Sequence, residues 1–176
     1  MFIVLMAVLL FCPKNVFAED KSASAKIETK LAVAKNDYRV NVLRSYLKQY
    51  NSPLVDNAED FVKYADMYDL DWRFVAAISG LESTFGKEIP YNSYNGWGYG
   101  IYGTNTRSFE SWEDGIQTVS KDLREKYMNE WGATDVYAIG KIYAASPTWA
   151  QRVEYFMNRI QDYSINHSES ALPLTI

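Results

Sequence analysis

Histidine and cysteine are almost absent from this sequence, which holds one of each among 176 residues. The histidine, His167, lies close to the C-terminus, beyond the last predicted helix, and the cysteine, Cys12, lies in an N-terminal apolar run. A hydrolase of the Ser–His–Asp or Cys–His type would therefore lack its base in the predicted folded domain. A zinc peptidase or amidase would lack its ligands. We expect no metal and no cofactor.

Clustered positive charge and long hydrophobic runs are also missing. The formal net charge is −4, and binding to a phosphate backbone needs grouped Lys and Arg, so nucleic acid is not an expected partner. Beyond the N-terminus, no apolar run approaches the ~20 residues of a membrane helix. A membrane contact is expected only through an uncleaved N-terminus, and the chain is expected to be a monomer.

The N-terminus has the pattern of an export signal. Residues 2–12 form a short apolar run, and Val16 and Ala18 occupy the −3 and −1 positions of a cleavage site after Ala18. We therefore expect residues 1–18 to be a signal peptide and the protein to be secreted. No Lys or Arg precedes the apolar run, which leaves an uncleaved anchor at residues 2–12 as the alternative.

The rest of the chain is predicted to be mainly α-helical. Residues 19–37 are small and charged, which predicts a linker, and residues 164–176 are predicted to be a flexible tail. Between them, residues 38–163 are predicted to form one domain, because apolar side chains recur at three- and four-residue steps. Residues 87–108 are rich in glycine and aromatic residues and predict an irregular loop or a short β-hairpin. Helices are predicted near residues 38–50, 57–68, 71–85, 111–127, 135–145 and 146–163.

Aromatic residues are abundant, with 14 Tyr, 8 Phe and 5 Trp. A flat ring can cover the apolar face of a sugar, while Tyr and Trp also donate hydrogen bonds. Five aromatic residues directly follow the helix predicted to end at Phe85 and could line a sugar cleft. Their alternative role is cross-strand packing in a hairpin. They are Tyr91, Tyr94, Trp97, Tyr99 and Tyr102.

One acidic residue lies on an apolar face of that helix. Helical residues turn by about 100° each, which places Glu82 about 40° from Ile78, inside an otherwise apolar arc. Burial and the negative end of the helix dipole would both raise the pKa of its carboxyl group, as a general acid requires. The alternative is a structural carboxylate, paired with Arg73, Lys87 or a hydroxyl group.

Four segments resemble, in order, motifs of the lysozyme-like superfamily, in its endo-β-N-acetylglucosaminidase and lytic transglycosylase branches. The likeness covers roughly residues 52–160. Leu81–Gly86 resembles the E-S-x-F-G signature, and Tyr94–Gly98 with Gly100-Ile101 resembles N-x-F-G-I. Phe109–Ile116 resembles the start of the next helix, and Ile142–Ala145 resembles a late tyrosine element. The G-L-M-Q element of transglycosylases is absent, and Ala144 stands where Asn is usual.

This resemblance implies a lysozyme-like α-helical domain that cleaves peptidoglycan glycan strands outside the cytoplasm. It implies that Glu82 protonates the glycosidic oxygen and that Tyr143 lies nearby in the cleft, where we expect it to take part in catalysis by orienting the reacting group. The alternative for Tyr143 is a core tyrosine. The expected substrate-binding residues are Tyr91, Tyr94, Asn95, Trp97, Tyr99 and Tyr102. A second carboxylate could come from Glu88, Glu110, Glu113 or Asp114, although Glu113 and Asp114 also suit a helix N-terminus. The alternatives are a transglycosylase giving anhydro products, a non-catalytic glycan-binding domain, and an interaction domain that keeps only the fold.

Overall fold

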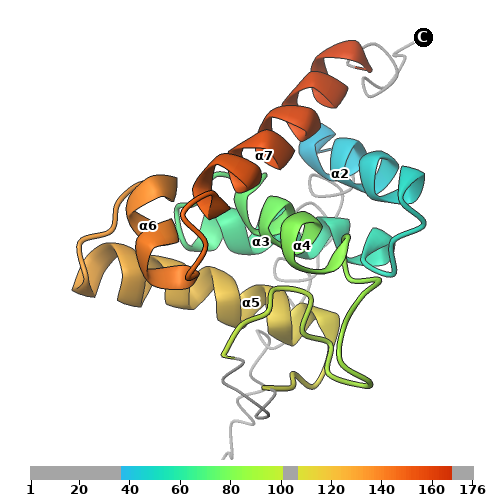
Figure 1. Ribbon diagram of the computed structural model, residues 1–176. Coiled ribbons are helices and arrows are strands. Elements are labelled where there is room, and N and C mark those ends of the chain that lie inside the picture. The colour runs from blue at the N-terminus through green and yellow to red at the C-terminus, as the bar shows by residue number, and fades with distance from the viewer. Residues whose placement is uncertain (1–36, 101–106, 168–176) are drawn as a thin grey trace, which may run out of the picture. The chain divides into compact units, whose positions relative to one another are not determined.

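The computed structural model describes residues 37–100 and 107–167, and within these ranges the chain is mainly α-helical with irregular connections (Figure 1). The predicted signal peptide, the linker up to residue 36, Tyr102 and residues 168–176 lie outside the described residues. No helix in the described part is long and apolar enough to cross a membrane. The elements are α2 (Tyr38–Gln49), the 3₁₀ turn η1 (Val55–Asn57), α3 (Ala58–Met67), α4 (Phe74–Ser83), α5 (Trp112–Asp122), the π-helix η2 (Leu123–Glu130), α6 (Val136–Tyr143) and α7 (Trp149–Asn166).

Helix α4 lies at the centre of the packed helices (Figure 1). It contacts α7 most extensively, and it also contacts α3 and α5. Every residue from Phe74 to Gly80 is buried, as expected for a helix that is surrounded on all sides. Its last turn is covered on one side only: Ser83 is buried, whereas Leu81 is half-buried and Glu82 is exposed.

Two predicted helix starts are confirmed by their caps. The Ser111 hydroxyl accepts a hydrogen bond from the Asp114 amide at 3.1 Å, and the Asp135 carboxylate accepts one from the Ala138 amide at 2.8 Å. Each cap satisfies an amide that has no partner within the helix.

The predicted start and end of the last helix were wrong by two or three residues. Ser146-Pro147 forms a turn before α7, which begins at Trp149 after Thr148. The helix continues to Asn166, beyond the predicted domain end at residue 163, because Ser164 is still buried. The helix after Ser111 also continues as η2, whose amides donate to carbonyls five residues back.

The connection between α4 and α5 contains no β-strand in its described residues, so the hairpin alternative was wrong there. Left-handed backbone at Thr84, Phe85 and Gly86 turns the chain sharply after α4, which extended strands could not follow. Side-chain hydrogen bonds then hold the loop. The Ser83 hydroxyl donates to the Gly96 carbonyl at 2.7 Å and accepts from the Gly86 amide at 2.8 Å. This hydroxyl fixes the loop against the end of α4.

Candidate active site

Glu82 is the penultimate residue of α4 and, contrary to the prediction, it is exposed. The prediction failed because it treated α4 as a helix with one buried side. The helix is instead buried all round up to Gly80, and the exposure of Glu82 depends on how other segments pack against the last turn, where Ser83 is buried.

Three segments meet at the Glu82 carboxyl group. From the start of α7, Nε1 of Trp149 donates a 2.6 Å hydrogen bond to Oε1 of Glu82. Arg152, one turn further along α7, lies close enough to stabilise the carboxylate electrostatically. From the loop, Gly98 approaches the other oxygen so closely that a Cβ atom there would lie 3.3 Å from Oε2. The carboxyl group is therefore held on two sides while the residue stays open to solvent.

The pKa of Glu82 is raised above its ordinary value, in the predicted direction. Crowding of the carboxyl group by protein atoms is the largest cause, because it removes water that would solvate the charged form. The Trp149 hydrogen bond and the charge of Arg152 oppose this shift by stabilising the anion. Glu82 thus keeps its proton to a higher pH than a freely solvated glutamate, which is the condition for a general acid.

Tyr143, the last residue of α6, lies beside this carboxyl group as predicted. Its ring stacks on Trp149, with centroids 4.7 Å apart and planes 25° from parallel. Its hydroxyl donates to the Trp97 carbonyl at 2.8 Å. Burial raises the pKa of this hydroxyl well above its usual range, and the charge of Glu82 adds to the effect. Tyr143 is therefore a neutral phenol whose proton points toward the loop.

Trp97 and Asn95, two of the residues predicted to bind substrate, are buried, and their side chains form hydrogen bonds within the protein. Trp97 is fully buried, and its Nε1 donates to the Val75 carbonyl at 3.0 Å. Asn95 is 1 % exposed; its amide group donates to the carbonyls of Tyr99 and Arg107, and its oxygen accepts from the Tyr99 amide at 3.0 Å. Both side chains build the loop that carries Gly98.

The tyrosines that were predicted to bind substrate lie in different environments. Tyr99 is half-buried, its ring lies 6.1 Å from that of Tyr143, and its hydroxyl donates to Asp122 at 2.6 Å. Tyr94 packs edge-on against Trp112 at 5.4 Å. Tyr91 is 93 % exposed. Of these three, Tyr99 is the one that contacts the group around Glu82.

The other acidic and basic candidates are engaged elsewhere. Glu113 forms an ion pair with Lys63 at 2.8 Å, and the Asp114 carboxylate accepts from the Glu110 amide at 3.0 Å at the start of α5. Arg73 pairs with Asp71, so it is not the partner of Glu82. Glu88 is exposed and accepts a hydrogen bond from Thr84 at 3.3 Å.

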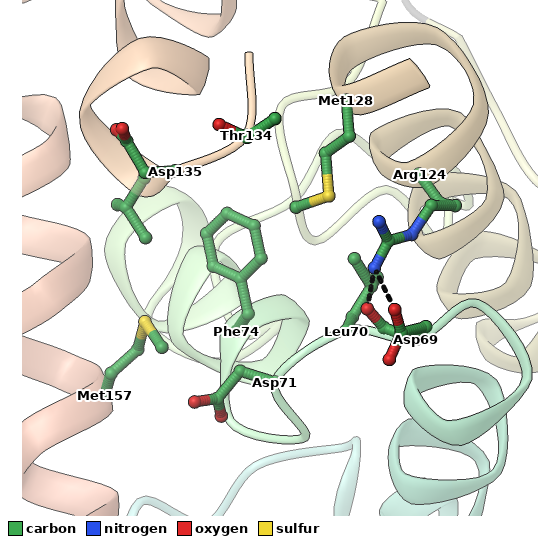
Figure 2. Close-up of a pocket in the computed structure, with 10 residues that line it drawn as sticks. Asp69, Leu70, Asp71, Phe74, Arg124, Met128, Thr134, Asp135 and Met157 are labelled. Carbon is green, nitrogen blue, oxygen red and sulfur yellow. Dashed lines mark hydrogen bonds and ion pairs between the residues drawn. The ribbon is translucent and has the colours of Figure 1, made fainter. Parts of the chain in front are cut away.

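A cavity of about 370 Å³ lies at the opposite end of α4 (Figure 2). It begins at Phe74, eight residues and about 12 Å along the helix axis from Glu82. The Arg124 side chain on its rim is bound to Asp69 at 3.0 Å, and Asp71 is bound to Arg73. This cavity is separate from the Glu82 site. Thr134 and Asp135 also line it, and the rest of its wall is apolar: Leu70, Phe74, Met128, Val136 and Met157.

Two contributors to the site were not predicted from the sequence. No contact between Trp149 and Glu82 was predicted, and Gly98 was noted only as the end of the Tyr94–Gly98 motif. The positive φ of Gly98, 59°, and its closeness to Glu82 give that glycine a specific role. Within residues 37–100 and 107–167, no group of His, Cys, Asp and Glu is arranged to hold a metal ion. The chain matches no protein-family model and no curated protein sequence.

Proposed function

We propose that this protein is an extracytoplasmic, monomeric enzyme with a lysozyme-like fold that cleaves peptidoglycan glycan strands, with Glu82 as general acid. One observation carries the proposal. Glu82 is open to solvent as a residue, while its carboxyl group is crowded by protein atoms, has a raised pKa, and is fixed between the Trp149 indole and Gly98 at the end of a buried helix. The resemblance of Leu81–Gly86 to the glutamate signature of that superfamily supplies the substrate class.

In the proposed reaction, protonated Glu82 transfers its proton to the glycosidic oxygen as the bond to the anomeric carbon breaks. The resulting carboxylate accepts the Trp149 hydrogen bond and lies near Arg152, so both groups stabilise the charge that Glu82 gains. A reaction with one acid needs a nucleophile from the substrate. If the oxygen of the neighbouring N-acetyl group attacks the anomeric carbon, water then opens the resulting oxazolinium ion and gives its proton to the Glu82 carboxylate, which completes hydrolysis. If the sugar's own 6-hydroxyl attacks instead, it gives its proton to the Glu82 carboxylate and forms a cyclic anhydro product.

A binding domain without catalysis explains this arrangement less well. Partial desolvation of a carboxyl group costs free energy, and a surface that only binds sugar does not need that group to hold a proton. In a general acid, the same desolvation favours catalysis, because it raises the pKa of the carboxyl group and so helps it to keep its proton toward neutral pH.

The decisive assay is incubation of the protein with purified peptidoglycan, followed by mass spectrometry of the soluble products. We expect glycan fragments. Reducing ends would identify a glucosaminidase or muramidase, and anhydro ends would identify a lytic transglycosylase. If the wall polymer binds and no fragment is released, the protein is a binding domain and the proposal fails.

Trp149→Phe should move the pH dependence of cleavage. The indole N–H stabilises the ionised form of Glu82, so its removal raises the pKa of Glu82 further. Activity that needs protonated Glu82 is lost as pH rises through this pKa. The alkaline limb of the pH–rate profile should therefore shift to higher pH.

Trp72→Phe is the matched control for this substitution. Trp72 packs on Tyr38, with ring centroids 6.4 Å apart, and it precedes α4 at the end opposite Glu82. The alkaline limb of the Trp72→Phe profile should therefore coincide with that of the wild type. An alkaline limb that stays in place in Trp149→Phe would mean that Glu82 does not govern it.

Gly98→Ala should lower cleavage of a short soluble glycan. The new methyl group would sit 3.3 Å from Oε2 of Glu82 and would displace the carboxyl group. The positive φ also costs an alanine about 1–2 kcal/mol. Gly132→Ala separates the two effects, since Gly132 has φ 70° and nothing within 4 Å of its added Cβ. We expect both variants to lose a similar amount of stability, and only Gly98→Ala to lose cleavage rate. Equal rates in the two variants would contradict the close approach of Gly98 to Glu82.

A further inference from the structure

Within the part of the chain that the structure describes, one charged residue is buried: Asp122, which ends α5 and is 6 % exposed. A buried carboxylate loses water, so its charge needs hydrogen bonds or opposite charges in exchange. Two donors reach the same oxygen, Oδ2: the Lys126 ammonium group at 2.9 Å and the Tyr99 hydroxyl at 2.6 Å. Lys126 follows Asp122 closely in the chain, whereas Tyr99 belongs to the loop beside Glu82. The Tyr99 contact therefore ties that loop to α5.

The Tyr99 hydroxyl keeps its proton and is the donor in this contact. Burial is the largest cause that raises the pKa of the phenol well above its usual range, and the hydrogen bond and charge of Asp122 add to it. The neighbouring Tyr127 acts in the same direction, and Arg107, whose guanidinium lies 5.3 Å from the centre of the Tyr99 ring, opposes the shift. The phenol is therefore neutral over the whole pH range in which Glu82 could act as an acid.

Gly98 lies between two residues that are tied to helices outside the loop. Before it, the Trp97 indole donates to a carbonyl group of α4 at 3.0 Å, and after it, the Tyr99 hydroxyl donates to Asp122 of α5. The Tyr99 backbone is also bound to Asn95, but Asn95 is part of the same loop and moves with it. Gly98 has no side chain that could fix it, so its position follows from its two neighbours.

The position of Gly98 affects how much water reaches Glu82. A Cβ atom at Gly98 would lie 3.3 Å from Oε2 of Glu82, so the loop backbone crowds that oxygen. The other oxygen, Oε1, accepts the hydrogen bond of Trp149, which comes from α7 and not from the loop. A movement of the loop would therefore expose the Oε2 side, and water there would stabilise the charged form of Glu82.

We propose that Asp122 is a positioning residue: through the Tyr99 hydroxyl it keeps Gly98 against Glu82, and so it keeps water away from one oxygen of the general acid. This inference rests on the proposed function for the role of Glu82, although the contacts themselves do not involve substrate. It gives a function to a buried charge whose hydrogen bonds go to Tyr99 and Lys126 rather than to Glu82.

The test measures the pKa of Glu82 by NMR, in ligand-free protein labelled at the side-chain carboxyl groups of glutamate. The Glu82 signal is identified by its absence from Glu82→Gln. Tyr99→Phe keeps the ring but removes the bond to Asp122, and Asp122→Ala removes the acceptor. We expect both to lower the pKa of Glu82, because water then reaches Oε2. Arg152 on α7 and Tyr143 on α6 also interact electrostatically with Glu82, and both are unchanged in these variants.

Asp122→Asn separates position from charge. Its single amide oxygen can accept both hydrogen bonds, as Oδ2 does in the wild type, while the negative charge is lost. The pKa of Glu82 should therefore stay near its wild-type value.

Tyr64→Phe is the matched control for Tyr99→Phe. The Tyr64 hydroxyl also donates to a carboxylate of α5, that of Glu113 at 2.8 Å, but about 14 Å along the helix axis from Asp122. Its loss should leave the pKa of Glu82 unchanged. Circular dichroism and thermal unfolding establish that each variant is folded, and if Asp122→Ala does not fold, Tyr99→Phe and Asp122→Asn decide the question.

The same change predicts the direction of a shift in the pH–rate profile. Cleavage needs protonated Glu82 and is lost as pH rises through the pKa of Glu82. A lower pKa in Tyr99→Phe moves the alkaline limb to lower pH, which is opposite to the shift expected for Trp149→Phe. A contact that only stabilised the fold would change the unfolding temperature and leave the limb in place.

The outcomes distinguish this inference from the proposed function. If Tyr99→Phe leaves the pKa of Glu82 unchanged, the positioning role is wrong, even where the wild type cleaves the glycan. If Asp122→Asn lowers the pKa as much as Asp122→Ala, the charge of Asp122 acts on Glu82 through space, which also overturns the positioning role. If the wild type releases no fragments but Tyr99→Phe and Asp122→Ala lower the pKa and Asp122→Asn does not, the proposed function fails and the positioning of Glu82 stands.

Discussion

Glu82→Gln is expected to reduce the rate of peptidoglycan cleavage by about 10²–10⁴-fold, the usual contribution of a general acid. Glutamine has the same shape and can still accept the Trp149 hydrogen bond that Glu82 accepts at 2.6 Å. It cannot donate the carboxyl proton. The substitution therefore removes the chemistry while it preserves the contacts. The measurement is the initial rate of soluble fragment release at saturating substrate.

Stability should change little in the same variant. Glu82 is exposed, and exposed substitutions usually alter the free energy of unfolding by less than about 0.5 kcal/mol. Glu154→Gln on α7, where the carboxylate accepts a hydrogen bond from Tyr137 at 2.7 Å, is the control for loss of a surface carboxylate and should retain the wild-type rate. A Glu82→Gln rate within tenfold of the wild type would remove Glu82 from the mechanism.

Trp97→Ala is expected to have the largest effect on stability, a loss of about 3–5 kcal/mol. Trp97 is fully buried, and its ring contacts rings from three directions. Phe61 of α3 lies 6.4 Å away and Trp112 of α5 lies 6.3 Å away, while Phe109 of the loop lies 6.2 Å away. Truncation would leave a large cavity where these segments meet, and urea unfolding measures the loss.

The same substitution should also lower activity. The Trp97 carbonyl accepts the Tyr143 hydroxyl at 2.8 Å, and the next residue is Gly98 beside Glu82. Collapse of the loop into the cavity would move both the Trp97 carbonyl and Gly98. Tyr91→Ala, at a residue that is 93 % exposed in the same loop, is the control and should leave stability within about 0.5 kcal/mol of the wild type. A small loss in Trp97→Ala would mean that the loop does not depend on this ring.

Local signals in the sequence predicted most of the helices. The caps at Ser111 and Asp135 act within one turn, so the residues that carry them are sufficient to place a helix start. The start of α7 was missed because Ser146-Pro147 has the same local pattern as a cap while Thr148 takes the position before the helix. The π-helix was missed because its apolar residues also fit an α-helical spacing.

The site was less predictable because its parts come together only through packing. The last-turn position of Glu82 and the direction of its pKa shift could be inferred from one helix. Its exposure could not, since it depends on how other segments pack against the last turn of α4. Its hydrogen bond from Trp149 joins residues 67 positions apart and has no local signal. Alternating glycine and aromatic residues also did not reveal that Trp97 enters the core while Tyr91 does not.

The Ser83 hydroxyl, which joins the end of α4 to the Gly96 carbonyl, has a consequence for thermal fluctuations. The end of the helix and the loop share this one buried group, so neither can open without breaking the hydrogen bonds of the other. They therefore open and close as one cooperative unit. Glu82 belongs to the helix side of that unit and Gly98 to the loop side, so opening of the unit would separate them.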